Sequence, residues 1–185
     1  MGKVLETIDS ELATWMEAQP LFFVATAPLS ADGYVNCSPK GGDAFRVLGP
    51  LEAAYLDFTG SGIETVAHLR ENGRIVIMFC AFSGKPNIVR LHGIGDIITD
   101  GHEDWEALSA LFSPNPGARA VIRIRVSRVS TSCGFSVPLM TYEADRDVLD
   151  RWAIAKGEEG LREYRALKNT TSLDGLPALN REDLG

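Results

Sequence analysis

Cysteine and histidine are scarce in this sequence, and the few that occur are scattered. The three cysteines, Cys37, Cys80 and Cys133, are odd in number and far apart in a chain of 185 residues. This pattern excludes a disulfide framework and lacks the spacing of a zinc site, so we expect reduced thiols typical of the cytoplasm. The three histidines share no metal-ligand spacing either, and we predict no metal site.

Long apolar runs and an excess of positive charge are also missing. No stretch approaches the roughly 20 apolar residues of a membrane helix, and the N-terminal segment carries acids where a signal peptide has an apolar core. Lysine and arginine number 18 against 25 aspartates and glutamates, which gives a net charge of −7. We therefore expect no nucleic-acid partner, no membrane partner and a cytoplasmic location.

Two common phosphate-binding motifs are absent as well, although a glycine-rich turn precedes a predicted helix. Such turns are places where proteins often hold phosphate. The turn, Gly60-Ser61-Gly62, lacks the Gly-Lys-Ser/Thr ending of a Walker loop and the third glycine of a dinucleotide fingerprint. Ser61 and Glu64 have the spacing of a capping box, so the turn is either a plain helix cap or part of a phosphate site. Because Glu64 would repel a phosphate there, a bound anion needs a cation from elsewhere.

Short apolar or alternating stretches bounded by turns predict strands, most of them joined as hairpins. The predicted strands cover residues 22–27, 34–38, 44–48, 53–58, 74–80, 87–99 and 118–130. Helices are predicted at residues 8–18, after the glycine turn, after residue 100, and at 146–156 and 158–169. This order lacks the strand–helix alternation of a doubly wound sheet, and a small antiparallel barrel with peripheral helices fits it better.

Two cations on the predicted strands are placed to reach the glycine turn across such a barrel. They are Lys40, in the run SPKGG, and Arg90, in the run IVRLHG. Arg74 is excluded, because a helix of about 11 residues, roughly 16 Å at 1.5 Å per residue, separates it from the turn.

The order of these segments resembles the flavin-binding split barrel of the pyridoxamine 5′-phosphate oxidase family. FFVATA is followed by YVNCSPKGG, by YLDFTGSG with the helix ETVAHLRENGR, and by IVIMF and NIVRLHGIG. The resemblance implies a mainly β fold, a six-stranded antiparallel split β-barrel with N- and C-terminal helices. Residues 1–130 would form the FMN-binding domain, and residues 131–185 a C-terminal loop and helical extension packed on the barrel or on the dimer partner.

The resemblance also implies a homodimer with FMN in a cleft between the subunits, acting as an FMN-dependent oxidoreductase on an unknown small molecule. The six cofactor-binding residues that it implies are Ser38, Lys40, Thr59, Ser61, Thr65 and Arg90. The first two match the strand that contributes a basic residue, the next three match the loop and first helical turn around the phosphate, and the last matches a strand bordering the cofactor. The sequence identifies no catalytic residue.

The sequence departs from the family in two places. Pyridoxamine phosphate oxidases carry a Ser-Arg-Lys run where this chain has Ile63-Glu64-Thr65, and they end in an Arg-x-His strand that is missing here. Pyridoxamine phosphate is therefore not the expected substrate, and two cations for a flavin phosphate are lost. A non-catalytic flavin or haem binding protein, a deazaflavin-dependent reductase and a protein without cofactor stay open as alternatives.

Other features have a plain structural explanation beside a functional one. Arg119, Arg123 and Arg125 share one face of the strand at 118–130. We favour a solvated face, or salt bridges to the acidic C-terminal helices, over a basic wall for an anion. His92 shares a strand face with Arg90 and is expected to be an ordinary strand residue. The loop 131–138 either covers a flavin ring or connects elements at the dimer edge.

Overall fold

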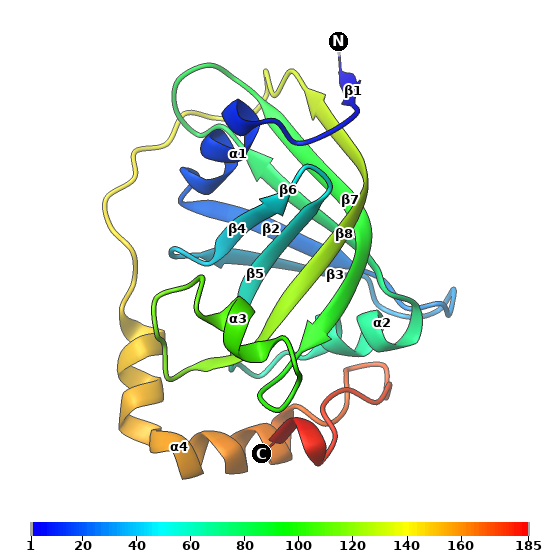
Figure 1. Cartoon of the computed structure of the whole chain (residues 1–185), viewed down its shortest axis with the longest axis vertical. Coiled ribbons are helices and arrows are strands. Elements are labelled where there is room, and N and C mark those ends of the chain that lie inside the picture. Colours follow the sequence, from blue (N-terminus) through cyan, green and yellow to red (C-terminus); the bar gives the residue numbers. More distant parts are fainter. Residues whose placement is uncertain (1, 185) are drawn as a thin grey trace.

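Strands dominate the computed structural model, which describes residues 2–184 (Figure 1). Eight of them form one antiparallel sheet: β1 (Lys3–Leu5), β2 (Leu21–Thr26), β3 (Asn36–Gly41), β4 (Phe45–Gly49), β5 (Glu52–Phe58), β6 (Arg74–Cys80), β7 (Ile88–Ile98) and β8 (Ala118–Ser132). The sheet curls around the core (Figure 1), so the predicted antiparallel split barrel is confirmed.

The strand order β3-β2-β6-β7-β8-β5-β4 leaves β3 and β4 at the two ends of the sheet, without a strand pairing between them. β1 lies off this path and pairs with the far end of β8, where Lys3 faces Thr131. β2 to β8 correspond to the seven strands predicted from the sequence, and with β1 the sheet has two strands more than the six that the family resemblance implied. A strand as short as β1 was not predicted, because three residues are too few to show alternation.

Alternation along the strands builds an aromatic core inside the barrel. Phe22 is buried at the centre, with its ring centroid 5.6 Å from that of Phe45, 5.7 Å from that of Tyr55 and 5.6 Å from that of Phe79. Its neighbour Phe23 faces outward and stays partly exposed. Tilted and edge-on aromatic pairs of this kind each stabilise the fold by about 0.5–1.5 kcal/mol beyond their buried area.

The helices lie around the barrel: α1 (Ser10–Glu17), α2 (Glu64–Asn72), α3 (Trp105–Ser109), α4 (Val148–Lys168) and the short 3₁₀ turn η1 (Glu182–Leu184). The Asp9 side chain caps α1 by accepting the Leu12 N–H at 2.8 Å. α4 breaks at Gly157, where φ is 66° and ψ is 173°, so the two helices predicted in this region are confirmed as two segments. None of the helices in residues 2–184 is both long and apolar enough to span a bilayer.

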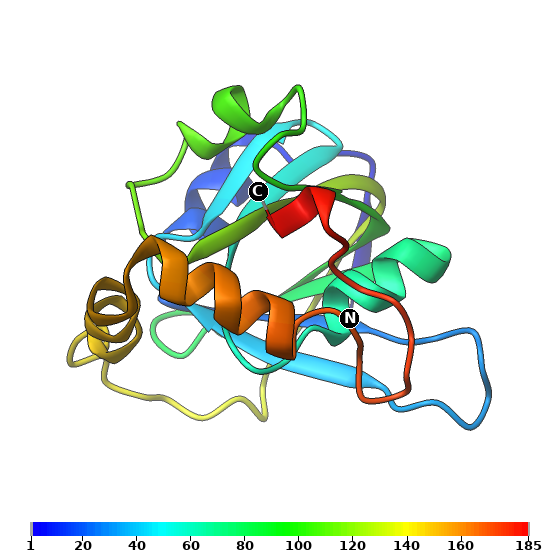
Figure 2. The same cartoon turned by 90° about the horizontal axis from the view of Figure 1, so that it is seen from below.

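The C-terminal segment crosses one end of the barrel and packs on α2. Figure 2, which views the molecule from below, shows α4 and the residues after it running across that end. A second, smaller apolar cluster joins Ala178 and Leu179 of this segment to Ile63, Val66 and Ala67 at the start of α2. The glycine turn before α2 thus lies beside the C-terminal segment, with Ser61 and Gly62 exposed.

Candidate functional site

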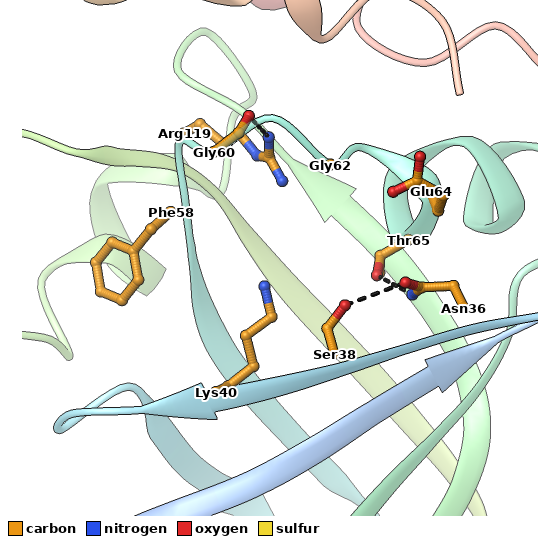
Figure 3. Close-up of a pocket in the computed structure, with 9 residues that line it drawn as sticks. All are labelled: Asn36, Ser38, Lys40, Phe58, Gly60, Gly62, Glu64, Thr65 and Arg119. Carbon is orange, nitrogen blue, oxygen red and sulfur yellow. Dashed lines mark hydrogen bonds between the residues drawn. The ribbon is translucent and has the colours of Figure 1, made fainter. Parts of the chain in front are cut away.

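A pocket of about 170 Å³ opens where β3, the turn before α2 and the start of β8 meet. The residues that line it are Asn36, Ser38, Lys40, Phe58, Gly60, Gly62, Glu64, Thr65 and Arg119 (Figure 3). Three of the six predicted cofactor-binding residues are among them: Ser38, Lys40 and Thr65. The structure thus brings the predicted basic strand and the glycine-rich turn together.

A buried carboxylate with two cations lies beside this pocket. Asp57 is fully buried, and its two oxygens accept hydrogen bonds from Lys40 Nζ and Arg119 Nε, each at 2.7 Å. Burial alone would raise the pKa of the Asp57 carboxyl, but Arg119 and Lys40 outweigh it and hold that pKa below its usual value. Lys40 and Arg119 thus bring two positive charges to the pocket against Asp57, while Glu64 adds a second carboxylate to the pocket lining.

Arg119 reaches the pocket because of a bulge in β8. Along the pairing of β5 with β8, Asp57 faces Ala120 but the next residue, Phe58, faces Ala118. Arg119 is therefore the extra residue of the bulge. Bulges redirect a side chain out of the regular alternation. The prediction that Arg119 lies on a solvated face with Arg123 and Arg125 is wrong for this reason, since its side chain is only 4% exposed.

The guanidinium of Arg119 is held from two sides and keeps one free nitrogen. Its Nη1 donates to the Asn169 side chain at 3.0 Å and to the Gly60 carbonyl at 3.4 Å. No residue in the described part of the chain accepts a hydrogen bond from Nη2, and Figure 3 shows a terminal nitrogen of Arg119 pointing into the pocket. An anion in the pocket would meet this donor together with the Lys40 ammonium.

Hydroxyl groups on the opposite wall are ordered by Asn36. The Asn36 amide donates to the Thr65 hydroxyl at 3.0 Å and accepts from the Ser38 hydroxyl at 3.1 Å (Figure 3). It also donates at 3.2 Å to Thr26, whose hydroxyl lies 2.9 Å from Nδ1 of the buried His68. The network fixes the side chains of Ser38 and Thr65 at the rim of the pocket.

The glycine-rich turn differs from the predicted helix cap. α2 begins at Glu64 with Ile63 in the capping position, and no side chain in residues 2–184 caps it. The capping-box prediction for Ser61 and Glu64 is therefore wrong. Glu64 accepts the Ile63 N–H at 3.0 Å and the Leu173 N–H at 3.3 Å, so its two oxygens are already used. The backbone N–H groups of residues 60–62 donate to no acceptor within the described residues, and Gly60 and Gly62 line the pocket.

The other three predicted cofactor-binding residues lie outside this pocket. Thr59 is buried behind the turn, where its hydroxyl accepts from Arg165 Nε at 2.8 Å. Ser61 is exposed on the turn. Arg90 lies on β7 and donates to the Ser132 hydroxyl at 3.1 Å, so one copy of the chain does not bring it to the pocket.

A larger groove of about 890 Å³ adjoins the pocket and shares Lys40, Phe58 and Gly60 with it. Apolar side chains from β2, β5, the loop after β6, the stretch before α4 and the start of α4 line much of it: Leu21, Leu56, Phe58, Phe82, Met140, Tyr142 and Leu149. A small polar pocket that opens into a larger, more apolar groove suits a ligand with a charged end and a flat apolar body.

A family model described as pyridoxamine 5′-phosphate oxidase matches residues 8–133. The chain belongs to this family. The matched span includes the barrel from α1 to the end of β8, with the pocket residues of β3, β5 and β8. α4 and the C-terminal segment lie beyond it.

Relatives agree with this assignment. The pyridoxamine 5′-phosphate oxidase family protein ustO of Aspergillus flavus is 39% identical over 198 residues, which cover 95% of this chain and 77% of that protein. HupZ from Group A Streptococcus is 26% identical with a TM-score of 0.52, covering 66% of this chain and 91% of that one. The FAD binding protein from Mycobacterium smegmatis, at 14% identity and a TM-score of 0.50 over 70% and 97% of the two chains, shares the fold.

The remaining candidates from the sequence have structural roles or lie apart from the pocket. Arg123 pairs with Glu52 and Asp104, and Arg125 pairs with Asp96, so their salt bridges form on the barrel itself and not with the C-terminal helices. His92 is exposed on β7. Within residues 2–184, no three histidine, cysteine or acidic side chains gather as a metal site requires.

The site residues that the sequence did not reveal are Asp57, Arg119, Arg165 and Asn169. One signal for the first two was present: Asp57 is a lone acid in the otherwise apolar strand AAYLDF. A buried carboxylate requires cations, and a strand that pairs with β5 was the place to seek one.

Proposed function

We propose that this protein binds FMN and acts as an FMN-dependent oxidoreductase on a small molecule. The observation that supports this most strongly is the pair of cations, Lys40 and Arg119, that share the single carboxylate of Asp57 at the pocket wall. Membership of the family supports a flavin as the cofactor. The phosphate end of FMN is what distinguishes it from the unphosphorylated flavin, and Lys40 and Arg119 offer that end two cationic donors.

The residues present fit a phosphate monoester. A phosphate dianion is held best by charged donors and by backbone amides in a glycine-rich turn. The pocket offers Arg119 Nη2, Lys40 Nζ and the backbone N–H groups of Gly60 and Gly62 as donors. Arg119 replaces the family's basic run, which is missing at Ile63-Glu64-Thr65. The repulsion expected from Glu64 is reduced, because two backbone amides already neutralise part of its charge.

The apolar groove is the proposed place for the flavin ring. Bound flavin supplies hydride-type redox chemistry, and the protein orients it. Phe58 lies at the junction of the pocket and the groove, where it excludes water from the path between phosphate and ring. Lys40 and Arg119 bind the phosphate, and Asn36 orients the hydroxyls of Ser38 and Thr65 beside it.

We also propose that the protein forms a homodimer. Phe23 on β2 faces Pro39 on β3 and Met78 on β6, and Met78 in turn faces Arg90 on β7. These four side chains point away from the core and form a partly exposed row across the sheet. A second copy packed on this row would let Arg90 border the flavin held by the other copy.

The unpaired Cys37, Cys80 and Cys133 suit a reducing, cytoplasmic environment.

The test is the visible absorption spectrum of the purified protein, followed by titration with FMN and reduction by NADH or NADPH. We expect paired flavin bands or saturable uptake of FMN, with Lys40→Ala and Arg119→Ala weakening it about tenfold or more. The matched control Arg123→Ala should leave affinity unchanged, because Arg123 lies on the outer face of the same strand.

Each other outcome of this test points to a different function. A Soret band in place of flavin bands would indicate a haem protein. FMN that binds but resists reduction would indicate a carrier, and selective uptake of a deazaflavin would indicate a deazaflavin-dependent reductase. A colourless protein that does not bind FMN would overturn the proposal.

A further inference from the structure

Asn169, just after α4, joins the two halves of the pocket. It is fully buried, and its Nδ2 donates to the Gly60 carbonyl at 2.8 Å. Its Oδ1 accepts from Arg119 Nη1 at 3.0 Å. One side chain therefore fixes both the glycine-rich turn and the guanidinium that points into the pocket.

Arg165, one helical turn earlier, holds the Thr59 side chain and the backbone just before Arg119. Its Nε donates to the Thr59 hydroxyl at 2.8 Å, and its Nη2 donates to the Ala118 carbonyl at 2.7 Å. Thr59 begins the glycine-rich turn, and Ala118 precedes the bulged Arg119. Burial and the nearby charge of Arg119 lower the pKa of Arg165, but an arginine stays protonated, so it adds positive potential behind the pocket.

The chain beyond Asn169 is held onto α2 by further contacts. The Leu179 N–H donates to the Asn169 carbonyl at 3.0 Å, and Leu179 packs against Ile63 and Val66. Asp183 then accepts from Arg70 at 2.6 Å and from the Thr99 hydroxyl at 3.1 Å. The helix whose first turn borders the pocket is thus covered by the same segment that carries Asn169.

We propose that the C-terminal segment from Arg165 to Asp183 is part of the phosphate site, with Asn169 and Arg165 as positioning residues. Docking of the segment holds Arg119 and the turn in place for the anion, and a bound anion in turn stabilises the docked segment, because such coupling is reciprocal. This inference rests on the proposed FMN site. It extends that site beyond the span that the family model matches, residues 8–133.

The first test compares Asn169→Ala and Arg165→Ala with the control Arg162→Ala, which removes an exposed arginine of α4 that pairs with Glu159. We expect the first two variants to weaken FMN binding about tenfold, equivalent to about 1.4 kcal/mol, and riboflavin binding less than threefold. The control should leave both affinities unchanged. General damage to the fold would instead weaken both flavins alike, and that outcome would overturn the inference.

The second test measures hydrogen exchange of the wild-type protein with FMN, with riboflavin and with neither. FMN should slow exchange of the Ala178 and Leu179 amides, which donate to the Thr170 and Asn169 carbonyls, and riboflavin should not. If FMN binds but the variants keep their preference for it and exchange is unchanged, the inference fails and the proposed flavin site stands. If wild-type protein binds no FMN, both fail.

Discussion

Asp57 and its two cations differ in kind from the other ion pairs on this sheet. Its side chain is 1% exposed, whereas the side chains of Arg123 and Glu52 are 36% and 32% exposed. A partly solvated pair contributes about 0–1 kcal/mol. Removing one partner of a buried pair costs much more, because the remaining charges have lost both water and counter-charge. Asp57 therefore stabilises the folded state and also fixes Lys40 and Arg119 at the pocket.

We predict that Asp57→Asn lowers the free energy of unfolding by about 3–5 kcal/mol, because Lys40 and Arg119 lose their counter-charge. Urea unfolding at pH 7 measures this directly. The control Glu52→Gln removes a partly exposed partner of Arg123 and should cost less than about 1 kcal/mol. Similar costs for the two variants would contradict a special role for Asp57.

Acid should erase the difference between the wild type and Asp57→Asn. The folded-state pKa of Asp57 is below its unfolded value of about 3.9, so the ionised carboxylate stabilises the fold above that pH. This contribution is lost as pH falls through the folded-state pKa. The gap in unfolding free energy should thus be constant from pH 7 to about pH 5 and shrink below about pH 4. A gap that stays constant down to pH 3 would contradict the assignment.

Strand alternation predicted the barrel correctly but misplaced Arg119, which departs from the alternation at a bulge. The strands at 22–27, 53–58 and 74–80 were predicted almost to the residue, since each buries alternate or continuous apolar side chains. Arg119 was misplaced, because a bulge cannot be read from one strand without its partner. Ser61 and Glu64 were misread as a cap, because the competing Leu173 amide lies 109 residues away in the sequence.

The break in α4 should depend on Gly157 and not on the nearby Gly160. Gly157 has φ of 66° and ψ of 173°, a region almost closed to other residues, and a Cβ there would meet no atom within 4 Å. Gly157→Ala should therefore cost about 1–3 kcal/mol through backbone strain alone. Gly160→Ala lies within the helix and should stabilise it by about 0.5–1 kcal/mol. Thermal unfolding of both variants measures these changes in stability. A Gly157→Ala variant more stable than the wild type would contradict the prediction.

The proposed dimer predicts a shared loss of assembly and of flavin binding. Met78→Glu places a charge in the outward row between Phe23 and Arg90 and should yield a monomer by analytical ultracentrifugation. Its affinity for FMN should fall as well, because Arg90 no longer borders the flavin of a second copy. Leu167→Glu changes an apolar residue of α4 that is 74% exposed. This control should change neither the assembly nor the affinity for FMN. A wild type that sediments as a monomer yet binds FMN tightly would contradict the shared cleft.

Under the proposed function, the pocket, the groove and the C-terminal segment together select a flavin by its phosphate. The most direct measurement is the ratio of dissociation constants of riboflavin and FMN for the wild-type protein, taken by fluorescence titration at one salt concentration. Two charged donors and the turn amides predict that FMN binds at least about 100-fold more tightly, because each charge-assisted bond contributes about 1.5–3 kcal/mol. Equal affinities, or no binding of either flavin, would contradict a phosphate site formed by Lys40 and Arg119.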